Sequence, residues 1–366
     1  MNYLFFFVHP SKFHLFRNTI NKLKNHGHNV DIVITSKDVL QALLIKEGWE
    51  YTNIFPKGRK MKGVSPYISS AINFFVTILR LYKYTFGKRY DLFITDDLLV
   101  YIGKVRGIPS IVFCDDDYIL IKQFALVLSK ATYILSPEIT DLGKYNSKKI
   151  GFPGYKELAY LHPSVFTPDL EIVKTFNPEL KPYYIIRLVS LRAYHDKGIK
   201  GISNYQVKQL IETLESKGNV YISSERELPE EYKEYSLKIN PVDITHVLYF
   251  AQLFIGDGQT MTSEAAVLGT PAFRCNDVVS KISVMEEKEE KYKLSFIYPP
   301  SKFDEMHQKI KELIETPNFK EEFQKRKEKM LTEKIDLSAF MIWLFENYKS
   351  IDFNQKIDFS KYTSYK

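Results

Sequence analysis

Residues 256–271 read Gly-Asp-Gly-Gln-Thr-Met-Thr-Ser-Glu-Ala-Ala-Val-Leu-Gly-Thr-Pro, between the short apolar runs 251–255 and 272–275. An apolar run followed by a glycine-containing turn and a polar segment predicts a strand that leads through a tight turn into a helix. The second apolar run returns to an extended pattern. We therefore expect a strand, turn and helix of the kind that an α/β protein repeats along its chain.

The start of this helix is suited to binding an anion. Gly256 and Gly258 let the backbone approach a ligand closely, Thr260 or Thr262 caps the helix, and the N–H groups of its first turn face a phosphate. Glu264 follows about one turn later, where its carboxylate accepts hydrogen bonds from the two hydroxyls of a ribose. The nucleotide-binding candidates in this segment are Gly256, Asp257, Gly258, Gln259, Thr260 and Glu264.

The same residues also fit a turn that binds nothing. Gly-Asp-Gly is a common turn sequence, and an acidic residue in the first helical turn gains about 0.3–1 kcal/mol from the helix dipole alone. The pattern also lacks the third glycine of the dinucleotide-binding fingerprint. The spacing by itself leaves both interpretations open.

The composition narrows the class of protein. A chain of 366 residues exceeds what one hydrophobic core usually organises, so we expect two domains. The net charge of +7 favours anionic partners such as nucleotide phosphates, acidic glycans or an anionic membrane, and no nucleic-acid-binding motif accompanies it. Cys114 and Cys275 lie far apart without metal-ligand spacing, so we expect free thiols, no metal site and a cytoplasmic protein, as the N-terminus also lacks a signal-peptide pattern.

The chain alternates short apolar runs with amphipathic segments. In the first half the expected strands are 3–8, 30–35, 91–95, 109–113 and 133–135, and the expected helices are 13–25, 37–46, 67–86, 98–106 and 119–129. The proline-rich residues 151–182 are interpreted as a linker. In the second half the expected strands are 183–189, 219–223 and 253–255, and the expected helices are 204–216, 243–250, solvated helices within the Lys/Glu-rich residues 286–334, and an amphipathic helix at 337–348.

This alternation predicts parallel sheets covered by helices. The fold class that follows is α/β, with two doubly wound Rossmann-like domains and a cleft between them. We expect the domains at residues 1–165 and 166–335, followed by a C-terminal helix and tail at 336–366. Because ligands of open parallel sheets bind beyond the carboxyl ends of the strands, the polar residues expected there are candidates: His9, Asp96, Asp97, Asp115, Asp116, Asp117 and Arg192–His195.

Three further blocks accompany the glycine turn: His9-Pro-Ser-Lys-Phe-His14-Leu-Phe, Gly154-Tyr-Lys-Glu-Leu-Ala-Tyr-Leu-His-Pro163 and Arg192-Ala-Tyr-His195-Asp-Lys-Gly198. Together these motifs resemble the family known as domain of unknown function 354, whose members are proposed glycosyltransferases, and more distantly the non-hydrolysing UDP-N-acetylglucosamine 2-epimerases. The resemblance implies a GT-B fold, with the last helix packed back on the first domain. It also implies a nucleotide-diphosphate sugar as substrate and no cofactor.

The resemblance implies roles for several of these residues. His14 or His9 would be the base that deprotonates an acceptor, and His195 with Arg192 would bind the diphosphate, helped by Arg187 and Lys197. In an epimerase, Asp96 and Asp116 would serve as acid and base. The alternatives are that His14 packs the start of its helix, that the cations are solvated loop charges, and that the aspartates hold Mg²⁺ or are unpaired loop charges.

The aromatic helix expected at 67–86 has basic residues at its edge. It either packs in the core of its domain or lies on the inner face of the cell membrane, near a lipid-linked acceptor. Three functions remain: a glycosyltransferase with a glycan or lipid-linked acceptor, a sugar-nucleotide 2-epimerase, and a non-catalytic nucleotide-sugar-binding protein. The sequence leaves the oligomeric state open.

Overall fold

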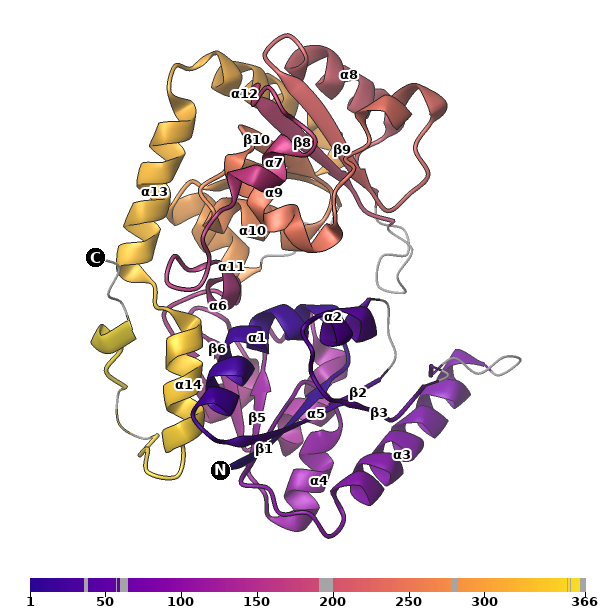
Figure 1. The fold of residues 1–366 in the computed structure, drawn as a ribbon, viewed down its shortest axis with the longest axis vertical. Coiled ribbons are helices and arrows are strands. Elements are labelled where there is room, and N and C mark those ends of the chain that lie inside the picture. The colour runs from indigo at the N-terminus through magenta and orange to yellow at the C-terminus, as the bar shows by residue number, and fades with distance from the viewer. Residues whose placement is uncertain are drawn as a thin grey trace. The chain divides into compact units, whose positions relative to one another are not determined.

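The computed structural model describes residues 1–35, 39–56, 58–59, 65–190, 200–277, 282–353, 355 and 357–362. The chain forms two compact units, coloured along the chain in Figure 1. Unit 1 contains Met1–Val165 and the C-terminal residues from Lys334, and unit 2 contains Phe166–Glu333.

Unit 1 is built on a parallel sheet with strand order β3-β2-β1-β4-β5-β6-β7. The strands are β1 (Asn2–Phe7), β2 (Asn29–Ile34), β3 (Thr52–Asn53), β4 (Leu92–Thr95), β5 (Ser110–Phe113), β6 (Tyr133–Pro137) and β7 (Lys149–Phe152). β1, β4 and β5 are buried almost throughout, which is why they are continuous apolar runs rather than alternating ones.

The helices of unit 1 cover this sheet. They are α1 (Pro10–Asn25), α2 (Leu40–Lys46), α3 (Pro66–Thr85), α4 (Leu99–Arg106), α5 (Ala125–Lys130), α6 (Leu158–Leu161) and α14 (Leu337–Asn347). The last of these comes from the far end of the chain and packs against α1 and α6. Its Phe345 lies with its ring centroid 6.2 Å from that of Phe5 on β1, so α14 contributes to the core of unit 1.

Unit 2 repeats the architecture with strand order β12-β11-β10-β8-β9, again parallel. Its strands are β8 (Tyr183–Leu188), β9 (Asn219–Ser224), β10 (Leu253–Gly256), β11 (Ala272–Cys275) and β12 (Ser295–Tyr298). Its helices are α7 (Leu170–Lys174), α8 (Asn204–Leu214), α9 (Ile244–Phe250), α10 (Gln259–Val267), α11 (Ser283–Glu286), α12 (Phe303–Glu315) and α13 (Phe319–Glu333).

Two expectations about secondary structure are wrong. Residues 286–334 are not only solvated helices, because β12 lies among them and Lys288 is fully buried. The Lys and Glu residues on either side of this short apolar run conceal it in the sequence. Residues 151–182 are not only a linker either, because β7 ends at Phe152 and the helices α6 and α7 follow.

The segment Gly154–Pro163, which contains α6, forms hydrogen bonds to α1 and to the C-terminal helix α14. The Ala159 carbonyl accepts hydrogen bonds from Asn18 of α1 at 2.9 Å and from Ser338 of α14 at 2.6 Å. His162 contacts Ser164, whose hydroxyl donates to Asp336, the N-cap residue of α14. The block therefore holds α14 on unit 1.

Candidate functional site

The strand order of each sheet defines where a ligand is expected to bind. In unit 1 the strands β2 and β3 lie on one side of β1, and β4 to β7 lie on the other side. The direction in which strands are added to the sheet therefore reverses between β1 and β4. In unit 2 the order reverses between β8 and β10. Open parallel sheets bind ligands beyond the carboxyl ends of the strands at such a reversal.

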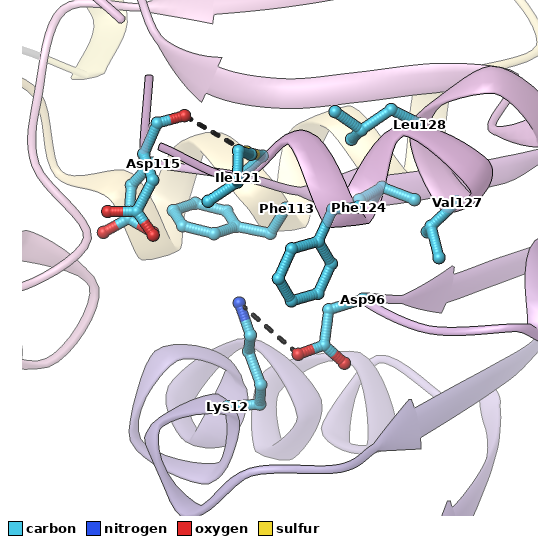
Figure 2. Close-up of a pocket in the computed structure, with 11 residues that line it drawn as sticks. Lys12, Asp96, Phe113, Asp115, Ile121, Phe124, Val127 and Leu128 are labelled. Atoms are coloured by element: carbon cyan, nitrogen blue, oxygen red, sulfur yellow. Dashed lines mark hydrogen bonds and ion pairs between the residues drawn. The ribbon is translucent and has the colours of Figure 1, made fainter. Parts of the chain in front are cut away.

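A pocket lies at this place in unit 1. Figure 2 shows Lys12, from the first turns of α1, pointing toward Asp96, which follows β4. The Lys12 ammonium lies 3.8 Å from the Asp96 carboxylate and 5.2 Å from the centroid of the Phe113 ring. The wall is mostly apolar, and the lining residues are Lys12, Asp96, Val112, Phe113, Cys114, Asp115, Asp116, Ile121, Phe124, Val127 and Leu128.

Asp115 is held ionised at the edge of this pocket. It follows β5, and its carboxylate lies 2.8 Å from the ammonium of Lys156, in the Gly154–Pro163 block. Burial alone would raise the pKa of Asp115, but the Lys156 and Lys12 cations hold that pKa below its ordinary value. The same contact raises the pKa of Lys156 against the effect of its own burial. The pair is therefore ionised at neutral pH.

Asp116 has the opposite electrostatic environment. Burial, followed by the negative charge of Asp115, raises the pKa of Asp116 to about 6, although Lys156 and Lys12 oppose the shift. A carboxyl group with a pKa this close to cellular pH exchanges its proton readily in both directions. Pockets that hold two carboxyls with divergent pKa values are typical of acid–base sites.

The neighbouring aspartates of these clusters have structural partners. Asp97 accepts two hydrogen bonds of 3.1 Å from the Arg59 guanidinium and one of 2.7 Å from the Leu98 N–H. Asp117 is buried and accepts the Asp141 N–H at 2.7 Å. Of the two expected acidic clusters, only Asp96, Asp115 and Asp116 line the pocket.

Neither predicted histidine base lines this pocket. His9 is the N-cap residue of α1, where its ring accepts the Ser11 N–H at 3.2 Å. His14 lies on α1 with its ring against Tyr160 of α6, 5.7 Å between centroids. Burial, with the nearby Arg17 cation, lowers the pKa of His14, so its imidazole is neutral at pH 7. His9, and not His14, caps the start of α1.

The predicted strand, turn and helix of unit 2 are confirmed by β10, the turn Asp257-Gly258 and α10. The expected cap is wrong: Gly258 occupies the N-cap position, which offers no side chain, and the Thr262 hydroxyl donates instead to the Gly258 carbonyl at 2.7 Å. The first-turn N–H groups of α10 therefore have no side-chain cap. Thr260 in this turn is exposed, whereas Glu264 is buried.

Asp257 serves the fold of unit 2. Its carboxylate accepts the Val189 N–H at 2.7 Å and an Arg226 N–H at 2.8 Å, and its carbonyl accepts the Asn276 amide at 2.8 Å. It therefore joins the residues that follow β8, β10 and β11. These bonds give Asp257 a positioning role at the reversal of the sheet, and its expected contact with the donor stays a prediction.

The two turn glycines are explained by packing. A Cβ at Gly256 would lie 2.9 Å from the Phe254 ring, and a Cβ at Gly258 would lie 2.8 Å from Cγ1 of Val189. Both distances are shorter than ordinary carbon contacts. Glycine is therefore required at both positions because the backbone lies close to side chains of unit 2. From the sequence we expected the same glycines to make room for a ligand.

The remaining donor candidates are only partly covered by the structure. His195, Arg192 and Lys197 lie outside the described residues. Arg187 bonds to Ser223 at 2.7 Å and forms an ion pair with Glu225.

Three cations had no role in the sequence-based expectations: Lys12, which lines the pocket, Lys156, which pairs with Asp115, and the buried Arg274. Lys12 and Lys156 were within quoted motifs but had no assigned role, and Lys156 meets Asp115 only through the fold. Arg274 is fully buried on β11, in register with Gly256, and its pKa is lowered by burial to about 10 while Glu289 opposes the shift. Arg274 could have been identified from the sequence, because it is the one charged residue within the short strand Ala272–Cys275.

Among the described residues, no three or more His, Cys, Asp or Glu side chains gather as a metal site. No helix within the same part of the chain is both long and apolar enough to cross a membrane.

Comparison with solved structures identifies the fold. The UDP-GlcNAc 2-epimerase from Neisseria meningitidis bound to UDP-GlcNAc matches with a TM-score of 0.68 at 13% identity, over 95% of this chain and 100% of that one. The S. aureus MnaA–UDP structure matches with a TM-score of 0.65 at 11% identity, over 98% and 100%. The calicheamicin glycosyltransferase CalG4 matches with a TM-score of 0.58 at 10% identity, over 96% and 99%.

The fold is therefore of the GT-B type, with two Rossmann-like domains, as in these glycosyltransferases and epimerases. No curated protein sequence matches the chain. A family model matches residues 7–344, and the chain belongs to the family described as Protein of unknown function (DUF354).

Proposed function

We propose that the protein is a glycosyltransferase that moves a sugar from a nucleotide-diphosphate donor to a glycan or lipid-linked acceptor. The observation that carries the proposal is Asp116, a half-buried carboxyl with a pKa of about 6 that lines a small, mostly apolar pocket beyond the ends of β4 and β5. A base for an acceptor hydroxyl needs this combination of near-neutral pKa and access.

In the proposed reaction Asp116 accepts the proton of the acceptor hydroxyl. At pH 7 a group with a pKa of about 6 is about nine-tenths ionised, so the base form dominates. The acceptor oxygen then forms the new bond to the anomeric carbon as the bond from that carbon to the diphosphate oxygen breaks. The products are the glycoside and a nucleoside diphosphate, and the proton remains on Asp116 until solvent removes it.

Lys12 and Asp115 have supporting roles in this proposal. The Asp115 charge raises the pKa of Asp116, while Lys12 and Lys156 limit that increase. The Phe113 and Phe124 rings in the wall offer flat apolar faces of the kind on which the C–H face of a sugar ring packs. The resemblance implied His14 or His9 as the base. We assign this role to Asp116 instead, because neither histidine lines the pocket.

Unit 2 supplies the donor-binding residues in this proposal. The uncapped N–H groups at the start of α10 bind the diphosphate, with His195 and Arg192 as further cationic partners, and Glu264 binds the ribose hydroxyls. The named relatives support a nucleotide-sugar substrate, since one is described with UDP-GlcNAc and another with UDP. No cofactor enters the proposed chemistry.

A second candidate is a sugar-nucleotide 2-epimerase. It is favoured by one observation: Asp96 and Asp116, from the ends of neighbouring strands, line the same pocket, and epimerisation needs an acid and a base. The Asp96 carboxylate lies 3.8 Å from the Lys12 ammonium, while Asp116 is the group that exchanges a proton near neutral pH.

The experiment is incubation of the purified protein with a panel of UDP-, GDP- and CMP-sugars without an acceptor, followed by NMR of the products. Slow release of a nucleoside diphosphate together with free sugar supports the transferase. A C2 epimer or a free glycal supports the epimerase. Binding without any product points to a non-catalytic binding protein and contradicts both enzymatic proposals.

Two matched variants assign the base. Asp116→Asn removes the titrating group with little change in size, and His14→Gln does the same on α1. We expect Asp116→Asn to reduce turnover at least a hundredfold and His14→Gln to leave it within about threefold, in line with the size of general-base effects. The reverse pattern would return the base role to His14.

A further inference from the structure

The helix α3 has two apolar faces, and unit 1 covers only one of them. On the covered face Thr77, Leu81 and Thr85 are fully buried, and the Phe74 ring lies 5.5 Å from that of Tyr101 on α4. The Arg80 guanidinium also donates to the Ile54 carbonyl. These contacts attach the helix to unit 1, where Figure 1 shows it beside α4 at the rim.

The other face presents large apolar side chains to solvent. They recur at alternating spacings of four and three residues, which places them along one side of the helix, and are Ile68, Ile72, Phe75, Leu79, Tyr82 and Phe86. Phe75 is 66% exposed and Leu79 67%. Isolated exposed apolar residues are ordinary, but a continuous stripe of them marks a binding surface. We refer to these six residues as the α3 stripe.

The stretch of sequence that contains the α3 stripe carries charges of one sign. Between residues 51 and 90 the sequence contains eight Lys and Arg residues and no Asp or Glu. The rest of the chain holds the other 43 basic residues and all 44 acidic residues, so its charges nearly cancel. The net charge of +7 for the whole chain therefore arises in this stretch. Two of the eight cations, Arg59 and Lys88, form ion pairs with Asp97 and Asp31. Lys83 and Arg89, at the end of the helix and just after it, are exposed.

We propose that the α3 stripe docks the protein on an anionic phospholipid surface. The apolar side chains enter the boundary between headgroups and acyl chains, while the basic residues contact the lipid phosphates. This combination of apolar stripe and single-sign charge is the recognised pattern of a helix that lies in the plane of a membrane surface. The inference depends on α3 and its charges alone, and not on the proposed function.

A second copy of this chain is the competing occupant of the α3 stripe. Its spacing of four and three would also suit a two-helix seam. Two copies joined there would, however, bring two acid-free basic stretches together, and the repulsion between them opposes association. Charge complementarity therefore favours lipid.

The test is flotation of the full-length protein with vesicles of phosphatidylcholine, with and without phosphatidylglycerol. The wild-type protein should float with the anionic vesicles and not with the neutral ones, and salt should weaken the association because it screens the charges. The variant Phe75→Asp/Leu79→Asp should bind the anionic vesicles at least tenfold more weakly. Its thermal melt should match the wild type, since both residues are exposed.

The control is Ile45→Asp/Tyr205→Asp, which adds the same charge at residues that are 61% and 70% exposed on α2 and α8. This variant should float like the wild type, so that a loss seen only at Phe75 and Leu79 supports the α3 stripe. Lys83→Gln/Arg89→Gln gives a second measure and should reduce binding to anionic vesicles several-fold. Because Lys83→Gln/Arg89→Gln keeps all six apolar residues of the α3 stripe, weaker binding by this variant cannot be caused by misfolding of the stripe.

Three results would overturn the proposal. The first is absence of wild-type flotation with anionic vesicles, and the second is an equal loss of binding in the two double aspartate variants. The third is a wild-type dimer in sedimentation velocity that separates in Phe75→Asp/Leu79→Asp without any vesicle binding, which would assign the α3 stripe to a second copy. Activity on nucleotide sugars in solution bears on none of these outcomes.

Discussion

At the scale of single residues, three consecutive aspartates have three different roles. Asp115 is ionised because Lys156 is beside it, Asp116 has a pKa of about 6 because of its burial and then the Asp115 charge, and Asp117 is a buried hydrogen-bond acceptor. The sequence predicted that this cluster lies at a strand end, since it follows an apolar run. It could not predict which aspartate titrates, because Lys156 approaches from 41 residues away along the chain.

Asp116 should make stability depend on pH. Its pKa in the folded protein is raised to about 6, so between its ordinary value and pH 6 the unfolded chain loses the proton before the folded protein does. The folded protein is therefore destabilised as pH rises through this range, by an amount that stays constant above pH 6. Asp116→Asn should increase the free energy of unfolding at pH 7.5 by up to about 3 kcal/mol, the equivalent of about two pKa units, and leave it unchanged near pH 4.

Urea denaturation at both pH values measures this effect. An equal change at pH 4 and pH 7.5 would mean that the variant acts through packing, and not through the titration of Asp116.

Lys156 should be required to keep Asp115 ionised. Lys156→Met leaves the Asp115 carboxylate without its cation at 2.8 Å, and we expect a loss of about 1–3 kcal/mol in the free energy of unfolding at pH 7, because the carboxylate remains poorly solvated. Lys122→Met, at an exposed position beside α5, is the control and should stay within about 0.5 kcal/mol. Indistinguishable urea midpoints for the two variants would contradict the role given to Lys156.

At the scale of elements, apolar runs identified most strands of both sheets, because strands buried on both faces have few polar residues. β12 was missed because Lys and Glu surround its short apolar run, and β3 because it has only two residues, Thr52 and Asn53. The helix α10 was predicted but its cap was not, since the choice between Gly258 and a threonine depends on how β8 approaches the turn. A Cβ at position 258 would lie 2.8 Å from Cγ1 of Val189, which follows β8, so the packing favours glycine at this N-cap position.

The turn at Gly258 gives a prediction about packing. Gly258→Ala places a Cβ 2.8 Å from Val189 Cγ1 and should lower the free energy of unfolding by about 1–3 kcal/mol without any ligand present. Val189→Ala in the same chain removes that methyl group and should restore most of the loss. A double-mutant cycle in urea measures the coupling, and additive effects of the two substitutions would show that they do not meet.

At the scale of the whole molecule, the chain returns to its first unit at its end. The sequence implied this only through resemblance, because nothing in the amphipathic pattern of Leu337–Asn347 states which domain it covers. The structure supplies the physical reason: Ser338 bonds to Ala159, Asp336 to Ser164, and Phe345 contacts the ring of Phe5.

Removing a core side chain of α14 should therefore destabilise unit 1. Phe345 is fully buried, so Phe345→Ala should cost about 3–5 kcal/mol, whereas Phe75→Ala on the exposed side of α3 should cost less than about 1 kcal/mol. Hydrogen exchange followed by mass spectrometry checks the location. Increased exchange in α1 and α6 is expected, and an increase confined to the C-terminal residues would show that α14 is only loosely attached.

The most direct test of the account is calorimetric titration of nucleoside diphosphates into the wild-type protein, Glu264→Ala and Asp116→Asn, with turnover measured on the same samples. The account predicts that Glu264→Ala weakens binding at least tenfold, while Asp116→Asn binds within about twofold of the wild type and loses turnover. Absence of nucleotide binding by the wild type, or an equal loss of binding in both variants, would contradict it.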